Sequence, residues 1–314
     1  PLKRILAVGG PGRLPPSPER ILVVRADNRL GNLVMLTSLL NALRERFPRA
    51  SVSVLANRGF HSILEGQGWE LIPVDRKAMA RRPWMLRGLA ARLGSMGFEA
   101  AIDASHPHGF SLSSAAAVAL TGCPCRIGSP IGASPGWYTH CPSSMPGKEQ
   151  HESRALHALG SVWPDWPRWS PPKLALPGGP GRRAVGIHPG AKPDKTFPVE
   201  FLEEVVRGCV PLAPVEVFWG NPGEEAVADA LVLAGAVKAE PMGLKEFARR
   251  ISGLAAFVCP DSGPMHVASA MGTPVVAMFR KEGAARFGPL SPRSVSVTGP
   301  DPEDVIRLAG ELLR

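Results

Sequence analysis

Long hydrophobic runs are missing from this 314-residue sequence. No apolar stretch approaches the roughly 20 residues needed to cross a bilayer. The longest candidate, residues 111–120, is mostly alanine and serine and is typical of a buried helix. Residues 5–8 are too short an apolar stretch for a signal peptide, and proline and glycine follow them. We therefore expect a cytoplasmic protein.

Cysteines and aromatic residues are also scarce. The five cysteines are scattered, and only Cys123 and Cys125 lie close, with one residue between them rather than the two typical of zinc and redox pairs. We expect reduced thiols. The net charge of +9 indicates an acidic partner. With one tyrosine and no run of five lysines or arginines, nucleic acid is the weakest choice, which leaves an anionic membrane surface or a phosphorylated substrate.

Short β-rich apolar runs alternate with helix-length amphipathic stretches along most of the chain. In the first half we predict strands at residues 20–27, 51–57, 71–74 and 100–103, and helices at 33–47, 61–65, 85–93 and 111–120. In the second half we predict strands at 184–188, 215–219, 257–259 and 274–279, and helices at 199–209, 224–233, 265–271 and 301–314. Such alternation predicts an α/β protein with a parallel, doubly wound sheet in each half.

A segment rich in proline and tryptophan separates the two halves. We predict an N-terminal domain at residues 1–165, a linker at 166–183, a C-terminal domain at 184–300 and a terminal helix at 301–314. Residues 1–19 form an extension, in which 4–13 imitate a strand and phosphate loop but precede prolines instead of a helix, so we expect an extra strand and a turn. Ligands bind beyond the carboxyl ends of such strands, so two facing domains imply an interdomain cleft.

The segment CPDSGPMHVASAMGTPVVAMF, residues 259–279, carries the strongest motif. Asp261, Ser262 and Gly263 are predicted to form a tight turn after a buried strand, with Pro264 at the first helical position. The amides of residues 262, 263, 265 and 266 would then converge on an anion at the positive end of the helix. His266 lies in the first turn, within reach of a phosphate.

A second strand-to-loop junction, HPGAKPDKTFP at residues 188–198, has the composition of a diphosphate site. The amides of Gly190 and Ala191, together with an ammonium group from Lys192 or Lys195, suit a diphosphate that becomes a leaving group. Lys195 is the better placed of the two lysines, because residues 197 and 198 would anchor the loop beside it.

A third junction, WGNPGEE at residues 219–225, puts carboxylates just past another strand. Glu224 or Glu225 could accept hydrogen bonds from ribose hydroxyls, and an ordinary acidic first helical turn explains both residues equally well.

These three segments, with RADNRLGNLVMLTSLLNALRERFP near the front, resemble glycosyltransferase family 9, the lipopolysaccharide heptosyltransferases. The resemblance implies a GT-B fold of two Rossmann-like domains, with the donor in the C-terminal one and the terminal helix at residues 301–314 packed back on the N-terminal domain. It also implies metal-independent, inverting transfer of heptose from ADP-heptose, a substrate rather than a cofactor, to a phosphorylated lipid-A core sugar. It assigns to the donor Gly190, Ala191, Lys195, Asp261, Ser262, Gly263 and His266, with Glu224 at the ribose and Met242 near the adenine.

The front segment departs from the family pattern at Asn32. The family usually has an aspartate there, proposed as the general base, and an amide cannot accept a proton from an acceptor hydroxyl. The cationic part of the loop, Arg25 and Arg29, is present and could bind an acceptor phosphate.

Two other carboxylates are therefore candidates for the base. Asp103 ends a predicted strand and has no cation beside it in the sequence; Asp27 ends another strand and ranks second, because Arg25 or Arg29 would weaken it as a base. His106 and His108 follow Asp103 and lack a third metal ligand, so we expect a loop role, with His106 at the acceptor.

The sequence thus predicts an inverting nucleotide-sugar glycosyltransferase that acts on a phosphorylated envelope glycan or glycolipid. The alternatives are a nucleotide-sugar epimerase of the same fold and a degenerate family member that binds nucleotide or glycan without turnover, as Asn32 suggests. Arg81, Arg82 and Arg87 flank Trp84, a composition that suits contact with an anionic lipid surface.

Overall fold

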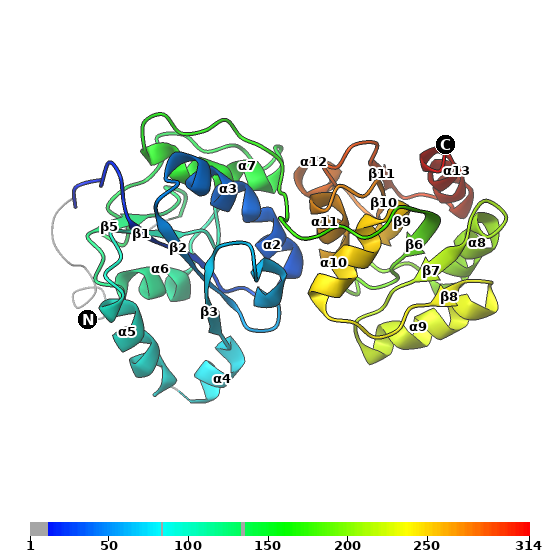
Figure 1. The fold of residues 1–314 in the computed structure, drawn as a ribbon, viewed down its shortest axis with the longest axis horizontal. Helices are drawn as coiled ribbons and strands as arrows, with labels where there is room; N and C mark the ends of the chain where they lie inside the picture. Colours follow the sequence, from blue (N-terminus) through cyan, green and yellow to red (C-terminus); the bar gives the residue numbers. More distant parts are fainter. Residues whose placement is uncertain (1–11, 83, 133–135) are drawn as a thin grey trace. The chain divides into compact units, whose positions relative to one another are not determined.

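The computed structural model describes residues 12–82, 84–132 and 136–314 (Figure 1). The chain divides into two compact units, Pro1–Pro171 and Pro172–Arg314. The extra strand expected within residues 4–13 falls almost wholly outside the described residues.

The first unit is built on a five-stranded parallel sheet. Its strands are β1 (Arg20–Arg25), β2 (Ser51–Asn57), β3 (Glu70–Val74), β4 (Ala100–Asp103) and β5 (Cys125–Ile127), in the order β3-β2-β1-β4-β5. The helices are α2 (Leu30–Met35), α3 (Thr37–Arg46), α4 (Arg76–Arg81), α5 (Met85–Ser95), α6 (Leu112–Ala119) and α7 (Glu152–Ala158), with 3-10 turns η1 (His61–Leu64) and η2 (Leu159–Val162). Central β1 is an unbroken apolar run with residues 21–24 at most 1% exposed, as a strand covered on both faces requires.

The helix predicted at residues 33–47 is wrong in two respects. It begins at Leu30, so Asn32 lies on a helix and not in a loop, and it divides into α2 and α3 at Leu36. The Thr37 hydroxyl donates to the carbonyl of Val34 at 2.7 Å, a side-chain bond that competes with the helical ladder and bends helices.

The second unit is built on a six-stranded parallel sheet. Its strands are β6 (Arg182–Ile187), β7 (Val215–Val217), β8 (Val237–Lys238), β9 (Leu254–Pro260), β10 (Val275–Phe279) and β11 (Val295–Thr298). The helices are α8 (Val199–Cys209), α9 (Pro222–Leu233), α10 (Leu244–Ser252), α11 (Gly263–Ala270), α12 (Ala284–Phe287) and α13 (Pro302–Leu312).

The two sheets share one topology. The second reads β11-β10-β9-β6-β7-β8, the same outward winding from a central pair as in the first unit, extended by one strand. The winding direction reverses between β1 and β4 in one unit and between β6 and β9 in the other. In doubly wound sheets this switch point leaves a crevice at the carboxyl ends of the two strands, where ligands bind.

The terminal helix α13 belongs to the second unit. It packs on α8, and Val305, Leu308, Ala309 and Leu312 are part of the core that the second sheet forms. The apolar face of this helix is thus used within its own unit.

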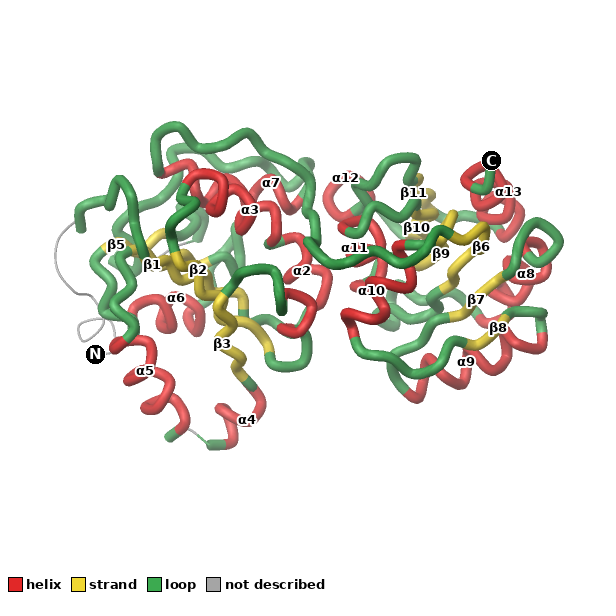
Figure 2. The backbone as a smooth tube through the Cα atoms, viewed as in Figure 1, coloured by secondary structure: helices red, strands yellow, loops and turns green. Residues whose placement is uncertain are grey.

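The tryptophans of the proline-rich segment pack on the first unit. Residues 163–181 form no helix or strand (Figure 2). The Trp163 ring lies edge-on to Phe47 at 5.2 Å and stacks on Trp166 at 6.0 Å, while the Arg154 guanidinium lies 3.8 Å from the ring of Trp169. Aromatic burial thus fixes this stretch where proline prevents regular structure.

Two hydrogen bonds bracket the passage from one unit to the next. Ser38 Oγ donates to the carbonyl of Ser170 at 2.7 Å, and the amide of Leu174 donates to the carbonyl of Ala270 at 3.1 Å. The tether between these anchors is residues 171–173, with the sequence Pro-Pro-Lys.

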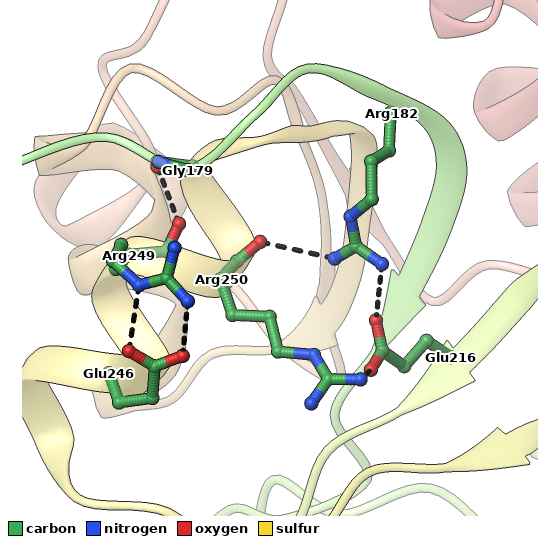
Figure 3. A network of polar contacts seen from close by, with 7 residues as sticks. Gly179, Arg182, Glu216, Glu246, Arg249 and Arg250 are labelled. Atoms are coloured by element: carbon green, nitrogen blue, oxygen red, sulfur yellow. Dashed lines mark hydrogen bonds and ion pairs between the residues drawn. The ribbon is translucent and has the colours of Figure 1, made fainter.

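An ion-pair network closes the amino end of the second sheet (Figure 3). Glu216 of β7 is 5% exposed, and its two oxygens face Arg182 of β6, at 3.1 Å, and Arg250 of α10. Arg182 also donates to the carbonyl of Arg250 at 3.3 Å. Two cations on one buried carboxylate connect strand, strand and helix, and they leave the carboxyl ends of the strands to the site described next.

Candidate functional site

The sequence-predicted donor residues converge at the switch point of the second unit. β6 and β9 are hydrogen-bonded neighbours, with Ile187 opposite Val258, and the amide of His188 donates to the carbonyl of Val258 at 3.0 Å. The loop after β6 and the turn after β9 therefore lie at the same edge of the sheet, although about 70 residues separate them in the chain.

An ion pair joins these two loops. The Lys195 ammonium contacts a carboxylate oxygen of Asp261, and it also lies 5.8 Å from the centre of the Phe287 ring. The Asp261 side chain is 11% exposed and that of Lys195 29%. Lys195 ends a tight turn in which its amide donates to the carbonyl of Lys192 at 2.8 Å. Asp261 thus holds a cation at the carboxyl ends of the central strands.

Helix α11 begins beside this pair. Ser262 is its N-cap residue, so Gly263 is the first helical residue and Pro264, predicted at that position, is the second. The Ser262 side chain caps no amide, and its buried Oγ has no hydrogen-bond partner among the described residues. The first-turn amides of a helix have no acceptor within it and lie at the positive end of its dipole. The turn therefore offers a hydroxyl and amides to an anion, with His266, 8% exposed, in the same turn.

Glu224 faces a buried histidine that sequence reasoning did not single out. His188 Nδ1 accepts from the amide of Gly190 at 3.1 Å, so the proton of the neutral ring is on Nε2, which lies 3.5 Å from Glu224 Oε2. Burial lowers the pKa of His188, against the opposing effect of Glu224. Glu224 also accepts from the amide of Gly220 at 2.8 Å. The imidazole and an amide thus fix the carboxylate above the 188–190 loop.

The close approach of Glu224 explains the glycine in this loop. A Cβ on Gly190 would overlap the Glu224 carboxylate. Asn221 caps α9 by accepting from the amides of Gly223 and Glu224 at 3.0 and 3.1 Å, which sets the first turn that carries the carboxylate. The neighbouring Glu225 is directed elsewhere, to the Lys238 ammonium at 3.2 Å. Of the two glutamates the sequence left open, Glu224 is the one in the cluster.

The remaining predicted donor residues lie around the cluster. Ala191 and Met242 are half-buried, the latter in the coil just before α10, and Lys192 is exposed. The carbonyl of Lys192 accepts hydrogen bonds from the amides of residues 195 and 196 in the turn.

The switch point of the first unit carries a second polar cluster. Arg25, at the end of β1, is 3% exposed; it donates to the carbonyl of Ala104, and its Nε lies 2.8 Å from Asp27 Oδ2. The Asn32 amide donates to the same oxygen at 3.0 Å. The other oxygen of Asp27, Oδ1, is buried and accepts no hydrogen bond from any described residue. Burial lowers the pKa of Arg25, and the facing carboxylates oppose this shift.

Asp103, at the end of β4, is enclosed by donors. Its Oδ1 accepts from the amide of Ser105 at 3.0 Å and from the hydroxyl of that residue, and its Oδ2 accepts from the Tyr138 hydroxyl at 2.6 Å. The residue is 4% exposed, and burial raises its pKa, while the three hydrogen bonds act in the opposite direction. Burial and the adjacent carboxylate raise the pKa of Tyr138, so its hydroxyl stays protonated and donates.

The other acceptor candidates lie near the chain surface. Arg29, the N-cap residue of α2, and His106 are exposed. His108 is turned to Glu152, with 3.5 Å between Nε2 and Oε2. Within the described parts of the chain, no three histidine, cysteine, aspartate or glutamate side chains gather as a metal site.

Comparison with protein families decides the class of the molecule. The model of glycosyltransferase family 9 (heptosyltransferase) matches residues 148–305, half of the chain. The chain belongs to this family. It is a glycosyltransferase, and the match spans the whole donor cluster of the second unit. No curated protein matches the sequence.

Solved structures share the fold of this family 9 enzyme over nearly the full chain. An E. coli heptosyltransferase, WaaC with ADP, has a TM-score of 0.79 at 19% identity and covers 93% of this chain and 99% of its own. A family 9 glycosyltransferase from Veillonella parvula has a TM-score of 0.77 at 17% identity, covering 94% and 97%. E. coli ADP-heptose lps heptosyltransferase II has a TM-score of 0.73 at 21% identity, covering 94% and 98%. The predicted GT-B fold is thereby confirmed.

No described helix of the family 9 enzyme is both long and apolar enough to cross a membrane.

Proposed function

We propose that this glycosyltransferase moves a heptose from ADP-heptose to a phosphorylated glycan or glycolipid of the cell envelope, with inversion at the sugar. The observation that carries the proposal is the cluster at the second switch point. There, the Lys195 ammonium is held by Asp261 next to the start of α11, where the Ser262 hydroxyl lacks a partner. A helix N-terminus with an adjacent ammonium is the standard protein site for phosphate groups.

Each part of the cluster has a place in the reaction. Lys195 neutralises the charge that grows on the diphosphate as the sugar leaves, and the first turn of α11 binds its oxygens. Glu224, whose carboxylate is fixed by His188 and Gly220, accepts from the ribose hydroxyls. Met242 contacts the adenine.

The choice of nucleotide and sugar is supported by similar structures. Two WaaC structures similar to this chain are named with ADP and with ADP-2-deoxy-2-fluoro heptose. At 19% identity the likeness to these structures establishes the fold alone, so ADP and heptose are proposed for this chain.

The first unit supplies the acceptor side. Arg25 is buried against Ala104 and Asp27, so its charge serves the protein's own carboxylates. Exposed Arg29 is the cation available to an acceptor phosphate, and Asn32 and exposed His106 are the further hydrogen-bonding groups proposed for the acceptor.

Thermal shift and product analysis test the proposal. ADP should raise the melting temperature more than UDP, GDP or dTDP at equal concentration, because only a ligand that binds the native state stabilises it. ADP-heptose incubated with lipopolysaccharide truncated before its heptose residues should then release ADP and yield a glycosylated lipid. A larger shift with another nucleotide refutes the ADP assignment. A changed sugar nucleotide with no transfer product indicates an epimerase.

We further propose that α4 and α5 contact an anionic membrane that carries the acceptor. Residues 76–98 contain six lysines and arginines and no aspartate or glutamate. At the start of α5, Trp84, Met85 and Leu86 are 66%, 39% and 44% exposed, and both helices lie at the edge of the first unit (Figure 1). Exposed apolar side chains among cations match an anionic lipid interface.

Vesicle co-sedimentation tests this contact. The protein should bind phosphatidylglycerol vesicles at low salt and not phosphatidylcholine vesicles. Reversing Arg81, Arg82 and Arg87 to glutamate should weaken binding by at least roughly 100-fold, because each lost cation contributes about 1 kcal/mol near the surface and the new carboxylates add repulsion. Leu233→Ala, at an 89% exposed position in the second unit, is the matched control. Equal binding to both lipids, or no effect of the triple reversal, would remove this surface from the proposal.

A further inference from the structure

We propose that Asp27 is the catalytic base of this enzyme, taking the place of the carboxylate that family resemblance expects at Asn32. The proposal rests on the transferase function proposed above and names the group that receives the acceptor proton.

The structure brings the two positions to one point. Asp27 follows β1, and Asn32 lies on α2, yet the Asn32 amide and Asp27 Oδ2 are 3.0 Å apart. A carboxylate from the strand end therefore lies within one hydrogen bond of the side chain at the position where the family usually has one. The Asn32 amide cannot act as a base, but it donates a hydrogen bond that orients the Asp27 carboxylate.

The two oxygens of Asp27 are not equivalent. Oδ2 accepts a hydrogen bond from the Asn32 amide and forms an ion pair with Arg25. Oδ1 is buried and has no hydrogen-bond donor among the described residues. A buried carboxylate oxygen without a hydrogen bond is costly, and such groups in native proteins call for an explanation. A hydroxyl of the acceptor sugar would supply the missing donor, and Oδ1 is then in place to take its proton.

Arg25 pairs with this carboxylate without being dedicated to it. The guanidinium is buried, and three carboxylates act on it electrostatically: Asp27, Glu152 and Asp103. Its charge is shared among these groups and the carbonyl of Ala104.

Asp103 fits a supporting role better. Both its oxygens already accept hydrogen bonds from Ser105 and Tyr138, and the residue is 4% exposed, whereas the Asp27 side chain is 17% exposed. Asp103 thus helps to compensate Arg25, and Asp27 is the carboxylate with an oxygen to offer.

The step balances as follows. The acceptor oxygen forms a bond to the anomeric carbon of the sugar, while its proton passes to Asp27 Oδ1. The bond from the anomeric carbon to the diphosphate oxygen breaks, and its electron pair leaves with the nucleoside diphosphate.

Relocating the carboxylate tests the assignment. With ADP-heptose and truncated lipopolysaccharide, Asp27→Asn should lower turnover by about 10²–10⁴-fold, the usual effect of losing a general base. The double variant Asp27→Asn/Asn32→Asp, which exchanges the two side chains, should regain at least about tenfold over the single variant. Glu204→Gln, an exposed carboxylate on α8, is the control and should match the wild type.

A second variant separates chemistry from folding. Asp27→Ala should regain turnover when formate is added, because a small carboxylate can enter the space left and accept the proton; a purely structural role would not respond to formate. ADP affinity should stay near the wild-type value, while both Asp27 variants should lose some thermal stability, because buried Arg25 loses an ion-pair partner. Wild-type turnover in Asp27→Asn, or a double variant no faster than the single one together with no formate effect, overturns the assignment. Failure of the wild type to bind ADP or use ADP-heptose would instead contradict the proposed function.

Discussion

Lys195→Ala should lower both turnover and ADP affinity, and a double-mutant cycle with Asp261 separates the two causes. Lys195→Ala deletes a charge aimed at the leaving diphosphate, and single electrostatic donors of this kind are typically worth about 2.7–4 kcal/mol, or 10²–10³-fold in rate. It also leaves the Asp261 carboxylate, 11% exposed, without its cation. Two like charges about 8 Å apart at an effective dielectric constant of about 20 repel by about 2 kcal/mol. Lys195→Ala/Asp261→Asn should therefore bind ADP roughly 30-fold more tightly than Lys195→Ala alone.

Isothermal titration with ADP gives the affinities, and initial rates with ADP-heptose give the turnover. The matched control is Lys281→Ala, because Lys281 pairs with Asp194 at 3.0 Å and both side chains are more than half exposed. Exposed pairs contribute at most about 1 kcal/mol, so this variant should stay close to the wild type. If the double variant binds ADP no better than Lys195→Ala, the Asp261 carboxylate does not face the diphosphate and the placement of the anion at this turn is wrong.

Three further predictions follow from individual contacts. Gly190→Ala should push the Glu224 carboxylate off its position and lower ADP affinity about tenfold or more, measured by titration, while the melting temperature changes little. Burial lowers the pKa of His157 to about 4, so between pH 6.5 and 4 the unfolded chain binds more protons. The free energy of unfolding from urea titrations should then fall by up to about 1.4 kcal/mol per pH unit as the pH drops, with a smaller slope in His157→Gln. Glu216→Gln should destabilise the second unit by about 2–3 kcal/mol in the same assay, because Arg250 and its neighbouring cation lose a buried partner; an unchanged urea midpoint would show that this network contributes little.

Local pattern was sufficient for most of the fold. The strands Ser51–Asn57 and Ala100–Asp103 and the helix Val199–Cys209 have the predicted bounds, since each is a compact apolar or amphipathic run with a clear end. The strands Cys125–Ile127, Val237–Lys238 and Val295–Thr298 were missed. All three are edge strands of two to four residues, too short for a period to show, and their extended form depends on the neighbouring strand.

The residues of the candidate site could be predicted from the sequence, but the contacts between them could not. Lys195 and Asp261 were singled out separately, but their contact depends on β6 lying next to β9, an order that the sequence does not display. His188 was not singled out within the HPGAKPDK loop. A histidine two residues before a glycine at a strand end is the signal that could have found it. Asp27 was ranked below Asp103 because of its neighbouring arginines, and the Tyr138 hydroxyl that occupies Asp103 Oδ2 lies 35 residues further along the chain, where local sequence does not show it.

The three-residue tether has a bearing on evolution as well as on mechanics. Proline fixes φ near −65°, and an extended proline-rich segment advances about 3.1 Å per residue, so residues 171–173 span only about 9 Å. A connection this short limits how far the two units can move apart. It also keeps the two units close together, so each is present at a high local concentration relative to the other. Under the proposed function, changes in the unit that recognises the acceptor leave the nucleotide site of the other unit intact, and the two units are still inherited together.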